Sequence, residues 1–115
     1  MAGMNATYRN AIAEHGGSLI THIALVDGVG AEISGGTYAR QAVTWASATD
    51  GTIRPSADLT FDIPADTTVA GWRAYDALTA GTEYGGEDLT PETFANQGEY
   101  TLLSAGTGIR HDQAV

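Results

Sequence analysis

The stretch Asp58-Leu-Thr-Phe-Asp-Ile-Pro64 carries the clearest secondary-structure signal in the chain. Leu59, Phe61 and Ile63 are apolar, and the residues between them are polar. Because successive side chains of a β-strand point to opposite faces, this period of two predicts a strand that is buried on one face. Pro64 is expected to end the strand, since proline has no N–H to donate to a neighbour.

Similar signals extend outward from this stretch. Segments rich in Thr, Val, Ile, Tyr and Trp favour strands, and Gly-rich turns separate them. The strands expected are Leu19–Val26, Tyr38–Ala46 with Val43 and Trp45 on one face, Val69–Tyr75, a hairpin arm at Gly81–Gly86, and Tyr100–Leu103. Thr90-Pro91-Glu92 is expected to open a loop or a single helical turn. About six or seven short strands predict an all-β fold, either an antiparallel β-sandwich or a jelly-roll-like barrel.

Helical periodicity occurs only at the start of the chain. Asn5 is a good N-cap residue, and a short helix after it places Tyr8, Ile12 and His15, with Ala11, on one face. Gly16-Gly17 is expected to end the helix. We therefore expect a single domain with three parts: an N-terminal arm and helix at 1–17, a β core at 18–105 and an extended C-terminal tail at 106–115.

The composition excludes several classes of protein. The chain has 115 residues, with 5 Lys plus Arg against 14 Asp plus Glu, and its net charge is −9. It has no cysteine, and all five cations are arginines, so disulfides and thiolate sites are excluded. An acidic, lysine-free surface repels a phosphate backbone, which argues against nucleic acid as a partner. No apolar run is long enough to cross a bilayer, and Met1–Arg9 lacks the pattern of a signal peptide.

No motif indicates catalysis, a metal ion or a cofactor. His15, His22 and His111 are too far apart in sequence to predict a metal site, and Asp27–Glu32 is interpreted as a plain turn rather than a calcium loop. No serine lies in a nucleophile elbow. The carboxylate pairs Asp58/Asp62 and Glu87/Asp88 are expected to be solvated, and Gly35-Gly36 and Gly85-Gly86 to supply positive φ in hairpins. We expect a protein that is not an enzyme and uses no cofactor.

Aromatic and arginine side chains are the candidates for an interface. Trp72 and Tyr75 fall on opposite faces of their expected strand, so that one of them faces outward beside Arg73. Because Trp, Tyr and Arg dominate binding hot spots, these three residues are predicted to contribute to a contact surface, together with Tyr84 and Arg110. Exposed, coplanar aromatic rings here would favour a sugar-binding surface, whereas buried rings would count against one.

Several motifs along the chain form a more specific pattern. They are Glu32-x-Ser-Gly-Gly-x-Tyr-Ala-Arg40, Trp45, Phe61-Asp-Ile-Pro-Ala-x-Thr-Thr-Val69, Trp72 with Asp76-Ala77, Pro91-Glu-x-Phe94 and Gly98-x-Tyr-Thr-Leu102. In this pattern the sequence resembles a family of small virion structural proteins of actinobacterial tailed phages and prophages, commonly labelled tail fibre proteins. The resemblance covers nearly the whole chain except its last residues.

The resemblance implies a non-enzymatic protein on the exterior of the virion, assembled in the cytoplasm of the bacterial host. Two placements are open. The favoured one is a capsid decoration or cement protein, a homotrimer bound to the major capsid protein, because this chain has no coiled coil or triple-helix repeat from which to build a fibre. The alternative is a tail fibre or tail-tip module, bound to other tail proteins and to a host cell-surface glycan.

Overall fold

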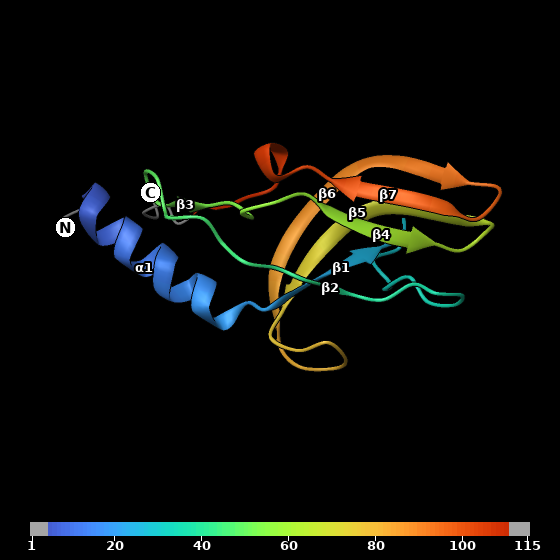
Figure 1. Ribbon diagram of the computed structural model, residues 1–115, viewed down its shortest axis with the longest axis horizontal. Coiled ribbons are helices and arrows are strands. Elements are labelled where there is room, and N and C mark those ends of the chain that lie inside the picture. Colours follow the sequence, from blue (N-terminus) through green and yellow to red (C-terminus); the bar gives the residue numbers. More distant parts are fainter. Residues whose placement is uncertain (1–4, 111–115) are drawn as a thin grey trace.

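The computed structural model describes residues 5–110, which form one helix at one end of an elongated, mainly β structure (Figure 1). The principal extents are 51 × 25 × 25 Å. The elements are α1 (Ala6–Leu19), β1 (His22–Val26), β2 (Gln41–Ala42), β3 (Thr52–Ile53), β4 (Leu59–Ile63), β5 (Thr67–Tyr75), β6 (Glu83–Phe94), β7 (Gly98–Leu102), the 3₁₀ turn η1 (Ser104–Gly106) and β8 (Ile109–Arg110).

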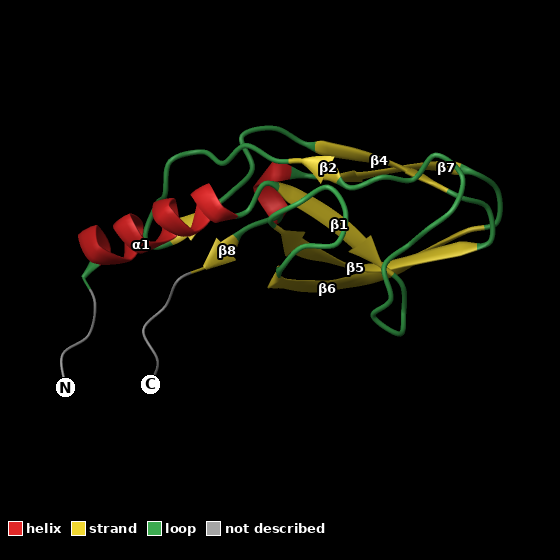
Figure 2. Cartoon of the chain, turned by 90° about the horizontal axis from the view of Figure 1, so that it is seen from below, coloured by secondary structure: helices red, strands yellow, loops and turns green. Residues whose placement is uncertain are grey.

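All the strand pairs are antiparallel. A four-stranded sheet has the order β2-β1-β5-β6, and the pairs β3–β8 and β4–β7 form two further ribbons. The ribbon β4–β7 lies over the four-stranded sheet, and β3–β8 lies beside α1 (Figure 2). This arrangement confirms the all-β class with one short helix, while the finer expectation of a sandwich or jelly-roll barrel stays a prediction.

The core lies between the four-stranded sheet and the β4–β7 ribbon. Its buried members come from four strands and three connections and are Ile20, Ile23, Leu25, Ile33, Val43, Phe61, Ile63, Val69, Trp72, Ala74 and Leu102. The strand predicted from alternation is confirmed as β4, with Phe61 and Ile63 fully buried and Asp62 exposed. Asp58 and Asp62 are both exposed, as the sequence predicts.

The prediction of a loop at Thr90-Pro91-Glu92 is wrong, because these residues belong to the 12-residue strand β6. Strand β6 is at the edge of its sheet, where proline is tolerated. The register with β5 also shifts between Val69 and Gly71, opposite this segment, and again near Gly85, whose φ is +102°. Strand β6 therefore accommodates Pro91 and Gly85, which usually interrupt a strand, at two irregularities in its pairing with β5.

The strand expected at Tyr38–Ala46 is reduced to β2, Gln41–Ala42. After β2 the backbone changes partners: the Val43 N–H donates to the Thr21 carbonyl, whereas the Ala46 N–H donates to the Arg54 carbonyl. The segment thus passes from β1 to the chain leading out of β3, and its pairing with β1 forms a strand only at Gln41–Ala42.

Helix α1 begins as predicted but ends later. The Asn5 side chain accepts a hydrogen bond from the Tyr8 N–H at 2.9 Å, which confirms the N-cap. Gly16-Gly17 does not end the helix, which continues to Leu19. A Cβ on Gly17 would meet the side chains of Ile53 and Trp45 at 3.2 Å, so glycine here permits close packing rather than a helix end.

The described part of the expected C-terminal tail, residues 106–110, is held in the fold rather than extended away from it. Ile109–Arg110 form β8 and pair with Thr52–Ile53. His111, the rest of the expected tail, and the first four residues of the expected N-terminal arm lie outside the described residues. No helix within residues 5–110 is long and apolar enough to cross a membrane.

Candidate interaction surfaces

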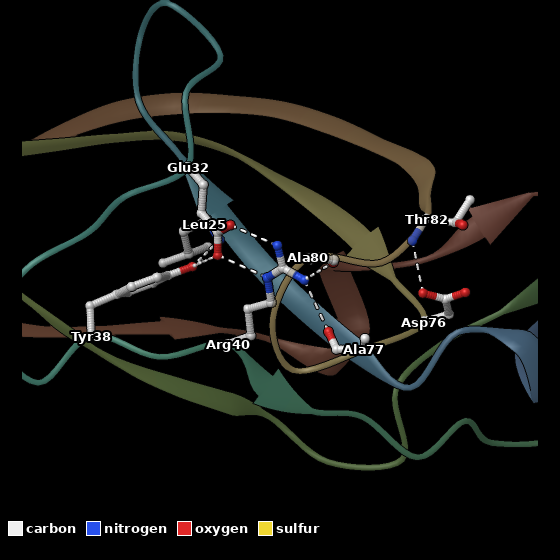
Figure 3. Close-up of polar contacts among 8 residues, drawn as sticks. All are labelled: Leu25, Glu32, Tyr38, Arg40, Asp76, Ala77, Ala80 and Thr82. Atoms are coloured by element: carbon white, nitrogen blue, oxygen red, sulfur yellow. Dashed lines mark hydrogen bonds and ion pairs between the residues drawn. The ribbon is translucent and has the colours of Figure 1, made fainter.

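The Glu32–Arg40 motif folds into one polar cluster (Figure 3). Arg40 donates from Nε to Glu32 Oε2 at 2.9 Å and from Nη2 to Glu32 Oε1 at 2.8 Å. The Arg40 side chain is only 7% exposed and that of Glu32 is 29% exposed. This two-point geometry matches the planar fork of the guanidinium to the carboxylate, and these hydrogen bonds raise the pKa of Arg40 above its usual value.

Tyr38 joins this ion pair to strand β1. Its hydroxyl donates to Glu32 Oε2 at 3.2 Å and accepts from the Leu25 N–H at 3.0 Å. Its ring stacks on Phe61 in the core, with the centroids 6.4 Å apart. Burial is the main cause that raises the pKa of Tyr38 well above its ordinary value, and the nearby Glu32 carboxylate acts in the same direction.

The remaining donors of Arg40 hold the connection between β5 and β6. Nη1 donates to the carbonyls of Ala77 at 3.0 Å and Ala80 at 2.7 Å, and the guanidinium lies 3.7 Å from the centre of the Tyr75 ring. Within the connection, Asp76 Oδ1 accepts from the Thr82 N–H at 2.8 Å. The Glu32–Arg40 motif therefore holds loops together. The sequence did not predict this role, because the carbonyls that Arg40 binds lie far from it in the chain.

Three of the five predicted interface residues do not project from the surface. Trp72 is 1% exposed and belongs to the core, because it lies on the face of β5 that is covered by the β4–β7 ribbon. Tyr75 is half-buried beneath Arg40. Arg73 folds back along its own strand, with Nη1 donating to the Trp72 carbonyl at 2.8 Å. The prediction that Trp72 contributes to a contact surface is wrong, because its ring is buried, whereas the predictions for Arg73 and Tyr75, which are partly exposed, stay predictions.

The other two residues, Tyr84 and Arg110, lie in one groove. It has a volume of about 680 Å³ and is lined by β3, β5, β6 and the segment that contains η1 and β8. Tyr84 is 43% exposed, and Arg54, Glu87 and Arg110 lie in the same lining. Glycine is required after Tyr84 for two different reasons. Gly85 has positive φ, and a Cβ on Gly86 would collide with the Trp72 carbonyl. The groove thus combines the exposed ring of Tyr84 with donors and acceptors, and the buried Trp72 also belongs to its lining.

Metal-ligating side chains do not gather within residues 5–110, where no group of three or more His, Cys, Asp or Glu residues is close enough to hold an ion. The Asp27 loop is a turn, as expected: its Oδ1 accepts from the N–H groups of Val29 and Ala31 at 3.0 Å. Of the histidines, His22 contacts the neighbouring Thr21 hydroxyl at 2.9 Å through Nδ1.

The fold and its surfaces define an elongated β-rich module with a polar groove beside β6. A family model, described as podophage GP4 fiber I protein gp80, matches residues 18–109, and the chain belongs to this family. No curated protein and no solved structure gives a significant match to the chain. Membership makes the chain a phage fibre-type protein, places it in the virion and implies contact with other virion proteins. It supports the tail fibre alternative better than capsid decoration.

Proposed function

We propose that this chain is a non-enzymatic structural unit of a phage tail fibre. The family match over residues 18–109 carries the proposal. We also propose that the chain folds as one domain, because a single buried cluster runs from Ile20 to Leu102. Fibre families of this kind are structural, so the surfaces of the molecule, rather than a catalytic centre, are expected to perform its function.

The shape of the molecule supports a role in a fibre. Both ends of the described chain meet at the same place: Arg9 in α1 binds Asp50 at 2.7 Å, and Arg110 in β8 pairs with Thr52. The connection from β4 to β5 and the connection from β6 to β7 lie at the opposite end of the long axis (Figure 1). An elongated module in which α1 and β8 lie at the same end is suited to attachment there, leaving the other end to face outward.

The test is the copy number of the chain in purified virions, measured by quantitative mass spectrometry against the major capsid protein and the tail proteins. We expect a number that matches the tail proteins, with antibody labelling at the tail. A number comparable to that of the major capsid protein would overturn the fibre proposal and favour decoration of the capsid. Absence from the particle would overturn both.

Glycan binding in the groove is a second candidate function, favoured by the half-exposed ring of Tyr84 next to Arg54, Arg110 and Glu87. Sugars stack on aromatic faces, and polar groups around the ring fix their orientation. With purified host cell-wall glycan, Tyr84→Ala is expected to abolish binding and Tyr84→Phe, which keeps the ring, to preserve it. Equal binding by Tyr84→Ala and the unmodified chain would exclude this site.

A further inference from the structure

The indole of Trp72 carries a hydrogen-bond donor that the described fold does not use. Trp72 is 1% exposed, and its Nε1 is a buried atom with no hydrogen-bond partner within residues 5–110. The other indole, that of Trp45, donates from Nε1 to the Ile20 carbonyl at 2.9 Å. Because a buried N–H without an acceptor is costly, nearly all such groups in folded proteins are paired. The Trp72 N–H is therefore suited to an acceptor that a ligand supplies.

Trp72 belongs to the lining of the groove as well as to the core. The rest of the lining comes from the first part of β6 and from the segments around β3 and β8. Glycines keep this lining open, since a Cβ on Gly85 or Gly106 would meet no atom within 4 Å. The groove volume of about 680 Å³ is within the usual range of small-molecule sites. The groove therefore offers a bound ligand both space and a buried donor.

Arg54 and Arg110 bring positive charge to the groove. Thr52 pairs with Arg110, and Arg54 follows Thr52 by two residues, so both exposed arginines project from the same face of the β3–β8 ribbon. The other three arginines of the chain each contact a carboxylate. The Arg54 side chain instead donates from Nη1 to a neutral group, the Ala105 carbonyl, at 2.9 Å. This contact orients the guanidinium, whose other nitrogens are donors suited to an anion.

We propose that the groove binds an acidic saccharide. The carboxylate of the sugar binds Arg54, the sugar ring stacks on Tyr84, and a sugar oxygen accepts from Trp72 Nε1. Tyr84 is 43% exposed, and sugars pack their apolar faces on aromatic rings. Arginine matches a carboxylate with two parallel hydrogen bonds. The proposal deepens the glycan binding proposed for this groove and rests on it for the sugar, whereas the acid group and the Trp72 contact are additional.

The charge of the chain limits the ligand to isolated acid groups. The net charge is −9, and Glu87 lies in the groove lining with the two arginines. A densely charged polyanion is repelled by this overall charge, whereas two neighbouring guanidinium groups attract a single carboxylate at short range. The Glu87 carboxylate is an acceptor for sugar hydroxyl groups. The groove is therefore suited to a saccharide that carries one acid group among several hydroxyls.

The experiment titrates the full, ¹⁵N-labelled chain with the methyl glycosides of glucuronic, galacturonic and mannuronic acids. The methyl glycosides of glucose, galactose and mannose are the matched neutral probes. NMR follows the two indole N–H signals separately. With at least one acid, the Trp72 signal should shift and saturate, while the signal of Trp45, whose N–H is already bonded, stays in place. That acid should bind at least about tenfold more tightly than its neutral counterpart.

Two pairs of variants test the site. Arg54→Gln should reduce the affinity for the acid to that for the neutral sugar, whereas Arg73→Gln, outside the groove lining, should keep the preference. Gly106→Leu places a side chain in the open groove and should abolish binding of either kind of sugar. Gly28→Leu is its control, because a Cβ there also meets no atom within 4 Å but lies outside this groove. Circular dichroism of each variant checks that it is folded.

The proposal is overturned if none of the acids shifts the Trp72 indole signal, or if Arg54→Gln keeps the preference for the acid. Equal binding of acidic and neutral sugars, lost in Tyr84→Ala, would overturn the acidic ligand and leave glycan binding in the groove standing. Binding of host glycan without binding of any acid would have the same meaning. The virion copy number is a separate result, so the fibre placement can stand while the acidic ligand fails, and the reverse.

Discussion

The Arg40 cluster and the outer face of α1 differ in whether their side chains have partners within the fold. In the cluster, Arg40, Glu32 and Tyr38 are bonded to one another and to backbone groups of β1 and of the β5–β6 connection. On α1, Tyr8 and Leu19 are exposed. The region with the most specific sequence motif holds the fold together, and a region with no motif is left available for contact.

The largest expected effect is that of Arg40→Ala. It leaves the Glu32 carboxylate without its cation and the Ala77 and Ala80 carbonyls without a donor. We expect a loss of about 3–5 kcal/mol in the free energy of unfolding, measured in urea, as for other buried pairs with one partner removed. Arg73→Ala is the control, because its ion pair to Asp88 is 3.4 Å long and Asp88 is 90% exposed. It should cost no more than about 1 kcal/mol, and a similar cost for both variants would refute a special role for the cluster.

Gly17→Leu tests the inner face of α1. The new side chain has no room against Trp45 and Ile53, so we expect a loss of about 1–3 kcal/mol in the free energy of unfolding. Thr7→Leu, at an exposed position of the same helix, should change stability by less than about 0.5 kcal/mol. If Gly17→Leu stabilises the protein, the helix does not pack on this side as described.

Tyr38 predicts a dependence of stability on alkaline pH. Its pKa is raised in the folded state, so above its ordinary pKa of 10.0 the unfolded chain loses a proton that the folded chain keeps. The stabilisation is complete below that pH and is lost above it, with a slope of up to about 1.4 kcal/mol per pH unit.

Tyr38→Phe should reduce this alkaline loss, as measured by urea unfolding at a series of pH values. It should also cost about 1–2 kcal/mol at neutral pH, because the Leu25 N–H loses its acceptor. Tyr100, whose pKa burial also raises, leaves a smaller residual slope in the variant. An unchanged alkaline slope in Tyr38→Phe would contradict the assignment.

Tyr84→Ala should have the smallest effect on the fold. The ring lies half-exposed in the groove, so the melting temperature should be almost unchanged and the free energy of unfolding should shift by less than about 0.5 kcal/mol. A loss of more than about 1 kcal/mol would show that Tyr84 is part of the structural framework, and would remove the contrast between the groove and the Arg40 cluster.

Sequence reasoning succeeded where the structural cause is local. The alternation around Phe61 predicted β4, and the Asn5 side chain predicted the helix cap. It failed at β6, because Pro91 and Gly85 mark breaks in a generic strand but not in an irregular edge strand. It also failed at Trp72, because the choice between the two faces of β5 depends on where the β4–β7 ribbon lies.

The sequence by itself determined the all-β class, the strand at Leu59–Ile63, the start of α1 and, through its motifs, a resemblance to phage tail fibre proteins. These features depend on neighbouring residues or on a linear pattern. Only the tertiary structure decided that Arg40 binds carbonyls 37 and 40 residues away, that Gly17 packs against Ile53 and Trp45, and that Tyr8 and Leu19 of α1 stay exposed. Contacts between segments that are distant in sequence decide which residues are buried. A local sequence pattern does not specify those contacts.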